Sequence, residues 1–218
     1  MAVTIDELRI ADAPEAWAAL GFALDGDVCV VGEVRIRLVG RDAGRGLVGW
    51  SLREVKGTEL DDSRVDLDGL ATERSKRSAP EPAPAHPNGL AGLDHVVAIT
   101  PALERTVAAL ETAGLDLRRI REEPTPAGAP RQAFFRLGAV ILEVVQEPPE
   151  AIERGGGPDR PAFFWGLAFA APEIETTVAG MGESVSEVRD AVQSGRRIAT
   201  LRRSAGLALP VALITPPA

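Results

Sequence analysis

The second half of this 218-residue chain contains two copies of one sequence pattern, and this internal repeat restricts the fold more than any other feature. The first part of the repeat has identical residues at a constant offset of 71 positions: Pro101 and Pro172, Glu104 and Glu175, Thr106 and Thr177, Val107 and Val178, and Ala108 and Ala179. The ends of the copies also correspond, at a slightly smaller offset, with 131–136 matching 197–202 and 143–148 matching 211–216. The repeat therefore predicts two copies of one structural module.

Each copy predicts a strand, a helix and three further strands, in that order. The first strand is a run of β-forming residues at 94–100 in one copy and at 164–170 in the other. The helix is indicated by apolar residues spaced i, i+4 and i+7, which share one helix face: Leu103, Val107 and Leu110, and Ile174, Val178 and Met181. The remaining strands are expected at 115–122, 131–137 and 139–146, and at 185–192, 196–203 and 207–214.

The N-terminal residues 3–57 predict a less regular version of the same β-α-β-β-β order. The expected elements are strands at 4–10, 24–31, 33–39 and 47–55 and a short helix at 14–20. The glycine-rich GRDAGRG at 40–46 joins two of these strands and lacks the Gly-Lys-Ser/Thr ending of a phosphate loop. We expect it to be a hairpin turn.

Between these regions, residues 73–89 are rich in proline, alanine and charge and show no apolar period. Their prolines prevent a helix and favour an extended chain, which is typical of a linker. Residues 58–72 either hold one short strand or extend that linker. We therefore predict a diverged N-terminal βαβββ-like module at 1–57, a linker at 58–91 and a domain at 92–218 whose two modules are 92–148 and 160–218.

The composition excludes several classes of protein. The net charge is −8, which disfavours general binding to nucleic acid or to an anionic membrane. The chain has one cysteine, Cys29, so it cannot form an internal disulfide. Cys29 lies in an apolar run and is expected to be a buried, inert thiol. The N-terminus has no basic region typical of a signal peptide, and the longest uncharged apolar stretch, 161–172, is too short to span a membrane. We expect a cytoplasmic protein.

A tandem pair of β-α-β-β-β modules resembles the vicinal oxygen chelate (VOC) superfamily, which includes glyoxalase I, bleomycin resistance proteins, fosfomycin resistance enzymes and extradiol dioxygenases. Three segments carry the resemblance: LDHVVAI at 93–99, RQAFFRLGAVILEVVQ at 131–146 and GRRIATLRRSAGLALPVALITP at 195–216. The resemblance covers residues 92–217 well and residues 3–57 weakly. It implies an α+β fold in which the modules form an open, glyoxalase-like sheet cleft with the functional site on its concave face.

The resemblance also implies half of a metal site. His95 and Glu143 match the two ligand positions of the first module, and an imidazole with a carboxylate suits a divalent metal such as zinc, iron or manganese. In the second module the corresponding residues are Gly166 and Val211, whose side chains cannot bind a metal. A catalytic metal normally keeps about three protein ligands, so two would bind it weakly.

Three further residues are alternatives for a missing ligand. His86 is the other histidine of the chain, and we expect it to be a solvated linker residue rather than a ligand. Asp6 and Glu54 of the N-terminal module are carboxylates, but nothing in the sequence places them near His95. For the His95 and Glu143 pair itself, the alternative to a metal site is a mutual hydrogen bond or contact with a ligand.

Three functions follow, from three classes of protein. The first is binding of a small organic molecule in the cleft without a complete metal site, by His95, Glu143, Phe164, Gly166 and Val211. The second is a metal-dependent lyase, isomerase or dioxygenase in which Glu143 is a metal ligand or the catalytic base. The third is a structural or interaction protein.

Because the N-terminal module lacks an obvious partner, we also predict a homodimer. The arginine-rich strands are expected to be solvated edges paired with acids.

Overall fold

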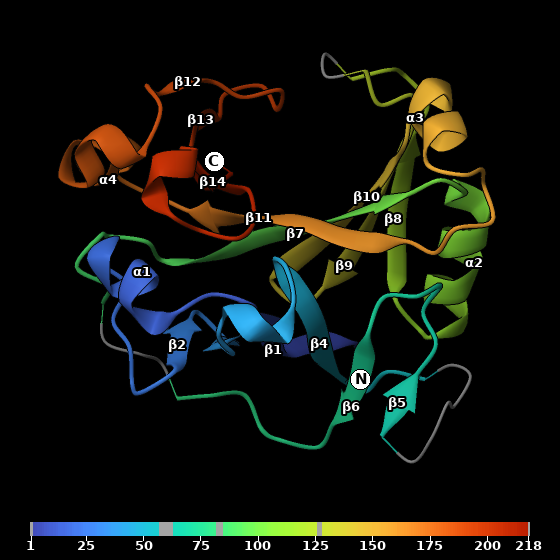
Figure 1. The fold of residues 1–218 in the computed structure, drawn as a ribbon, viewed down its shortest axis with the longest axis horizontal. Coiled ribbons are helices and arrows are strands. Elements are labelled where there is room, and N and C mark those ends of the chain that lie inside the picture. The colour runs from blue at the N-terminus through green and yellow to red at the C-terminus, as the bar shows by residue number, and fades with distance from the viewer. Residues whose placement is uncertain (1, 57–62, 82–84, 126–127, 218) are drawn as a thin grey trace. The chain divides into compact units, whose positions relative to one another are not determined.

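Two open sheets form the framework of the α+β fold in the computed structural model, which describes residues 2–56, 63–81, 85–125 and 128–217 (Figure 1). Within these residues the first sheet has the order β2-β3-β1-β4-β6-β5 and the second has the order β12-β13-β14-β11-β7-β10-β9-β8. The first sheet comprises β1 (Thr4–Ile10), β2 (Val28–Val31), β3 (Val34–Leu38), β4 (Leu47–Arg53), β5 (Arg64–Val65) and β6 (Thr72–Ser75). The second comprises β7 (Gly92–Thr100), β8 (Asp116–Arg121), β9 (Gln132–Leu137), β10 (Val140–Gln146), β11 (Phe163–Ala170), β12 (Arg189–Asp190), β13 (Arg197–Thr200) and β14 (Val211–Ile214).

The chain forms two compact units, each containing segments that are distant in the sequence. Unit 1 comprises Met1–Asp6, Gly49–Arg77 and Val96–Trp165, and unit 2 comprises Glu7–Val48, Ser78–His95 and Gly166–Ala218. Strands β1, β4, β7 and β11 each have residues in both units. Each unit therefore contains one module of the C-terminal repeat together with strands from the N-terminal region.

Unit 1 is organised around the first copy of the repeat. β9 and β10 pair antiparallel, with Glu143 opposite Phe134, and β8 pairs antiparallel with β9. Helix α2 (Leu103–Thr112) packs against β8, β9 and β10 and buries the apolar face that its spacing predicts, including Leu103 and Leu110 (Figure 1). A short helix, α3 (Pro149–Arg154), follows β10.

Unit 2 is organised around the second copy. β11 pairs in parallel with β14, placing Leu167 opposite Val211, and β13 pairs antiparallel with β14. Helix α4 (Ile174–Met181) lies beside β13 and is followed by the 3-10 turns η2 (Gly182–Ser184) and, after β13, η3 (Arg203–Ala205). The strand predicted at 185–192 shrinks to β12, whose two residues are both exposed, because an edge strand without a buried face gains nothing from packing.

The N-terminal sheet reaches beyond the range predicted for its module. In unit 2, β1 pairs in parallel with β3, and helix α1 (Pro14–Ala19) precedes β2. In unit 1, β4 pairs in parallel with β6, and β5 pairs with β6. β5 lies in the stretch 58–72, for which one of the two predicted alternatives is a short strand. β6 begins at the last residue of that stretch and continues into 73–89, which was predicted to be linker.

Burial explains why the chain forms strands there. Val65, Leu67 and Leu70 are buried, and the Trp50 indole donates a hydrogen bond of 2.6 Å to the hydroxyl of Thr72 on β6. Residues 58–62 and 82–84 of the predicted linker, together with residue 57 before it, lie outside the described residues. The domain boundaries at 57/58 and 91/92 stay a prediction.

The segment 40–46 is not the hairpin turn that its glycines suggest. It connects β3 to β4, and β1 lies between these two strands in the sheet. The connection therefore crosses over β1 and contains a 3-10 turn, η1 (Arg41–Ala43). No helix within the described residues is long and apolar enough to cross a membrane.

Candidate functional site

His95 is held by an acidic neighbour at the start of the second sheet's central strand. In unit 2, its Nδ1 lies 2.7 Å from Oδ1 of Asp94 on β7. The same carboxylate accepts hydrogen bonds from both terminal nitrogens of Arg196, whose Nε donates to the carbonyl of Thr215 at 2.6 Å. The side chains of His95, Asp94 and Arg196 are only 15%, 14% and 12% exposed. Together they form a partly buried His-Asp-Arg cluster.

The hydrogen bonds within this cluster orient the imidazole ring of His95. Burial opposes ionisation of Asp94, but the hydrogen bonds from His95 and Arg196 outweigh it and hold the pKa of Asp94 below its ordinary value. An ionised carboxylate only accepts hydrogen bonds, so Nδ1 of His95 is the donor. The hydrogen bond to Asp94 therefore fixes the orientation of the His95 imidazole ring.

Glu143 lies on β10 in unit 1, beside a residue that sequence reasoning missed. Its Oε1 accepts a hydrogen bond from the side-chain amide of Gln132 on the neighbouring strand β9. The carbonyl oxygen of that amide, Oε1 of Gln132, is buried and has no hydrogen-bond donor among the described residues. An unsatisfied buried acceptor is costly, so this position favours a ligand that carries an N–H or O–H group.

His95 and Glu143 belong to different compact units, so neither unit contains the predicted pair on its own. Each has a defined partner within its own unit, Asp94 and Gln132 respectively. Their predicted convergence on one metal or ligand stays a prediction.

Gly166 and Val211 occupy the two positions that the resemblance assigns to the remaining metal ligands. A Cβ atom added to Gly166 would lie 2.7 Å from the carbonyl oxygen of Pro210, so this position on β11 has no room for any side chain. Val211, on β14, is apolar and 1% exposed. Among the described residues, no group of three or more His, Cys, Asp or Glu side chains could hold a metal ion. The residues present therefore do not fit the four-ligand metal site of the family.

His86 is buried rather than solvated, contrary to the prediction. It is 6% exposed, its Nδ1 accepts the backbone N–H of Ala23 at 3.0 Å, and its Nε2 donates to the carbonyl of Val30 at 3.0 Å. Its ring also packs against Phe22, with ring centroids 5.7 Å apart. Burial lowers the pKa of His86. Because both ring nitrogens are engaged, His86 is not available as a third metal ligand.

The carboxylate of Asp6 also has hydrogen-bond and ion-pair partners within its own unit, unit 1. Its fully buried carboxylate accepts hydrogen bonds from Ser75 at 2.6 Å and from Arg77 at 2.7 Å, and it forms an ion pair with Arg53. Burial opposes ionisation, but these partners outweigh it and lower the pKa of Asp6. Glu54 is exposed and adopts a positive φ of 59°. The structure thus assigns Asp6 a role in holding the N-terminal sheet together.

Phe164 packs edge-on against a core tryptophan. In unit 1 its ring centroid lies 5.0 Å from that of Trp50, at an interplanar angle of 70°. Phe164 remains half-buried, whereas its neighbours Phe163 and Trp165 are 41% and 47% exposed. Its predicted role as an aromatic contact for a ligand stays a prediction.

Comparison with known proteins adds the fold family. No protein-family model matches the sequence, and no curated protein matches it. Among solved structures, a triple mutant of 4-hydroxymandelate synthase from Streptomyces coelicolor superposes with a TM-score of 0.65 at 15% identity, covering 97% of this chain and 92% of that chain. A xylose isomerase-like TIM barrel/4-hydroxyphenylpyruvate dioxygenase fusion protein superposes with a TM-score of 0.63 at 15% identity, covering 99% of this chain and 49% of that chain. This chain thus spans about half the length of the fusion protein.

Methylmalonyl-CoA epimerase from Mycobacterium tuberculosis also matches, with a TM-score of 0.47 at 15% identity over 60% of this chain and 91% of that chain. The two structures with TM-scores above 0.6, 4-hydroxymandelate synthase and the 4-hydroxyphenylpyruvate dioxygenase fusion protein, have the vicinal oxygen chelate fold. The chain therefore has the vicinal oxygen chelate fold, as the repeat and the three segments predict.

Proposed function

We propose that this protein binds a small organic molecule in a glyoxalase-like cleft without a complete metal site, as the bleomycin-resistance type of protein does. The observation that carries the proposal is the closed position at Gly166. A ligating side chain there would collide with the carbonyl of Pro210, and the equivalent of Glu143 is the buried Val211. The second module therefore offers no metal ligand at either position.

Each unit by itself contains polar groups that suit a small ligand. In unit 2, His95 is oriented by Asp94. In unit 1, Glu143 provides a carboxylate and Gln132 provides a buried carbonyl oxygen that has no hydrogen-bond donor among the described residues. A few well-placed polar groups in a largely apolar site are typical of small-molecule binding sites.

Elemental analysis of protein purified without an affinity tag, after loading with zinc, iron or manganese, tests the metal part of the proposal. We expect no stoichiometric metal in the wild type under any of these conditions. Stoichiometric metal that is lost in His95→Ala would refute the proposal. His95→Ala leaves the ion pair between Asp94 and Arg196 in place, so we expect the variant to fold.

Ligand binding is tested by thermal shift with a panel of small hydroxy acids and amides. We expect at least one compound to stabilise the wild type, with a smaller shift in His95→Ala and in Gln132→Leu. Gln193→Leu is the matched control, because Gln193 is exposed and lies outside the proposed site. A shift that is equal in all three variants would show that the compound binds elsewhere.

One observation favours the metal-dependent alternative. A histidine that binds a metal usually donates its other ring N–H to a carboxylate, and His95 donates Nδ1–H to Asp94 in this way. A lyase, isomerase or dioxygenase would need further ligands beyond His95 and Glu143. The elemental analysis above distinguishes this alternative from metal-independent binding.

A further inference from the structure

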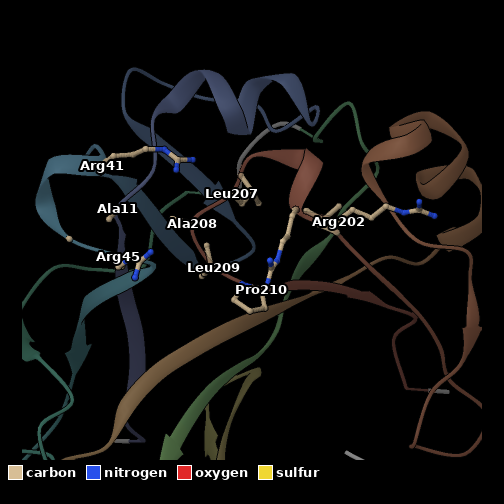
Figure 2. A pocket seen from close by; sticks show the side chains of 11 residues that line it. Ala11, Arg41, Arg45, Arg202, Leu207, Ala208, Leu209 and Pro210 are labelled. Carbon is tan, nitrogen blue, oxygen red and sulfur yellow. The ribbon is translucent and has the colours of Figure 1, made fainter. Parts of the chain in front are cut away.

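Four arginines line a hollow in unit 2 that is separate from His95. The hollow has a volume of about 810 Å³ and lies between the crossover 40–46 and the connection from β13 to β14 (Figure 2). Its lining includes Arg41, Arg45, Arg202 and Arg203, together with the apolar residues Ala11, Leu201, Leu207, Ala208, Leu209 and Pro210. The sequence predicts a hairpin turn at 40–46 and favours solvated edge positions for Arg202 and Arg203.

A buried aspartate ties the two connections together. The carboxylate of Asp12, which is fully buried, accepts the backbone N–H of Ala208 at 3.0 Å and the indole N–H of Trp17 at 3.2 Å. It also accepts Nη2 of Arg41 at 3.2 Å, and Arg41 donates in turn to the carbonyl of Gly206. The walls of the hollow are therefore preformed, which lowers the entropic cost of binding a ligand.

Neighbouring carboxylates compensate little of the positive charge of these arginines, and some of their N–H groups have no hydrogen-bond acceptor among the described residues. Asp12 compensates Arg41, but Nε and Nη1 of Arg41 have no partner among the described residues. Within the same described part of the chain, no carboxylate lies within 4.0 Å of the guanidinium groups of Arg45, Arg202 or Arg203. A positively charged hollow on a chain of net charge −8 is a local departure from the average surface.

The direction of the side chains separates Arg202 from the other arginines. Figure 2 shows Arg41 and Arg45 on the side of the hollow near Ala11, whereas Arg202 extends away from Leu209 and Pro210. Arg202 also lines a second hollow, which contains Glu183 and Glu187. Arg41, Arg45 and Arg203 therefore remain as the lining arginines of the first hollow that could bind an anion.

We propose that this hollow binds the phosphate groups of an organic phosphate. Guanidinium groups bind phosphate bidentately, and several of them together match an anion with more than one negative charge better than a monocarboxylate. The apolar side chains of Leu207 and Leu209 on the same lining suit the organic part of the ligand. The site uses none of the residues of the proposed cleft, so it is independent of that function.

Isothermal titration calorimetry with inorganic pyrophosphate, and then with adenosine diphosphate, tests the proposal. We expect saturable binding of both, and at least a tenfold weaker affinity in Arg45→Glu and in Arg203→Glu. Arg189→Glu is the matched control, because it makes the same change in net charge at an exposed position outside the hollow. We expect its affinity to stay within about twofold of the wild type.

Three results would overturn the proposal. An equal loss of affinity in Arg189→Glu would show that only net charge matters. Binding of pyrophosphate without adenosine diphosphate would show a site for an inorganic ion only. Citrate binding as tightly as adenosine diphosphate would show no selectivity for phosphate. Arg45→Gln and Arg203→Gln replace the glutamate variants if these fail to unfold cooperatively in urea.

Discussion

Replacing Gly166 with alanine tests the steric closure on which the proposed function depends. The added Cβ would lie 2.7 Å from the carbonyl oxygen of Pro210 and 3.3 Å from its Cβ. The Pro210 oxygen accepts the backbone N–H of Leu167 at 3.1 Å, so it cannot move aside without weakening that hydrogen bond. The alanine must therefore displace backbone that joins β11 to β14.

The expected cost follows from overpacking. Forcing extra carbon atoms into a packed site typically costs about 1–3 kcal/mol. In a chain of this size, each kcal/mol lowers the melting temperature by about 2–4 °C. Gly180→Ala is the matched control, because Gly180 lies in α4 with no atom within 4 Å of an added Cβ. It is expected to stabilise the protein by about 0.5–1 kcal/mol, since alanine loses less backbone entropy than glycine in a helix.

Urea unfolding of the two variants and the wild type provides the comparison. We expect the midpoint of Gly166→Ala to fall and that of Gly180→Ala to stay the same or rise. If Gly166→Ala is as stable as the wild type, the position is not closed and the argument against a metal ligand there fails. Gly166→His should then be tested for metal binding.

Four further predictions follow from buried groups and from the sequence. Folding lowers the pKa of Asp94, so its ionisation stabilises the folded protein at pH values above the unfolded pKa of about 3.8, and this stabilisation is lost as the pH falls through the folded pKa. Asp94→Asn should therefore be less stable than the wild type at pH 7. The difference in free energy of unfolding between the two proteins should shrink below about pH 4. Burial raises the pKa of Cys29 to about 12, so a thiol reagent at pH 8 should label it only after unfolding, and rapid labelling of the native protein would contradict its burial. Thr72→Val leaves the indole N–H of Trp50 without its acceptor and should cost about 1–3 kcal/mol in urea unfolding, whereas an unchanged midpoint would mean that the hydrogen bond contributes nothing. Gel filtration with light scattering should give the mass of a homodimer, and a strictly monomeric mass would contradict that prediction.

The order of elements could be predicted from the sequence because it depends on local patterns. The spacing of Leu103, Val107 and Leu110 predicts the buried face of α2, and all three side chains are buried. The β runs at 131–137 and 139–146 correspond to β9 and β10. The element that local patterns missed is β6, because its strand conformation depends on pairing with β4 rather than on its own apolar residues.

The candidate site could be predicted only in part. The family resemblance indicates His95 and Glu143, but the partners that set their chemistry come from elsewhere. Asp94 is adjacent to His95 in the sequence and could have been found by that position, whereas Arg196 reaches it from 102 positions away. Gln132 gave no signal, because a glutamine in a strand is as easily a solvated residue as a buried one.

The sequence by itself determined the repeat, the class of fold and the absence of ligating side chains at Gly166 and Val211. Only the tertiary structure decided that Gly166 is sterically closed, that His86 is buried, and that Arg41 and Arg203 line one hollow. The physical reason is range. Periodicity and residue type act over a few neighbours, whereas a closed position, a buried imidazole and a charged hollow depend on which distant strands and connections pack together.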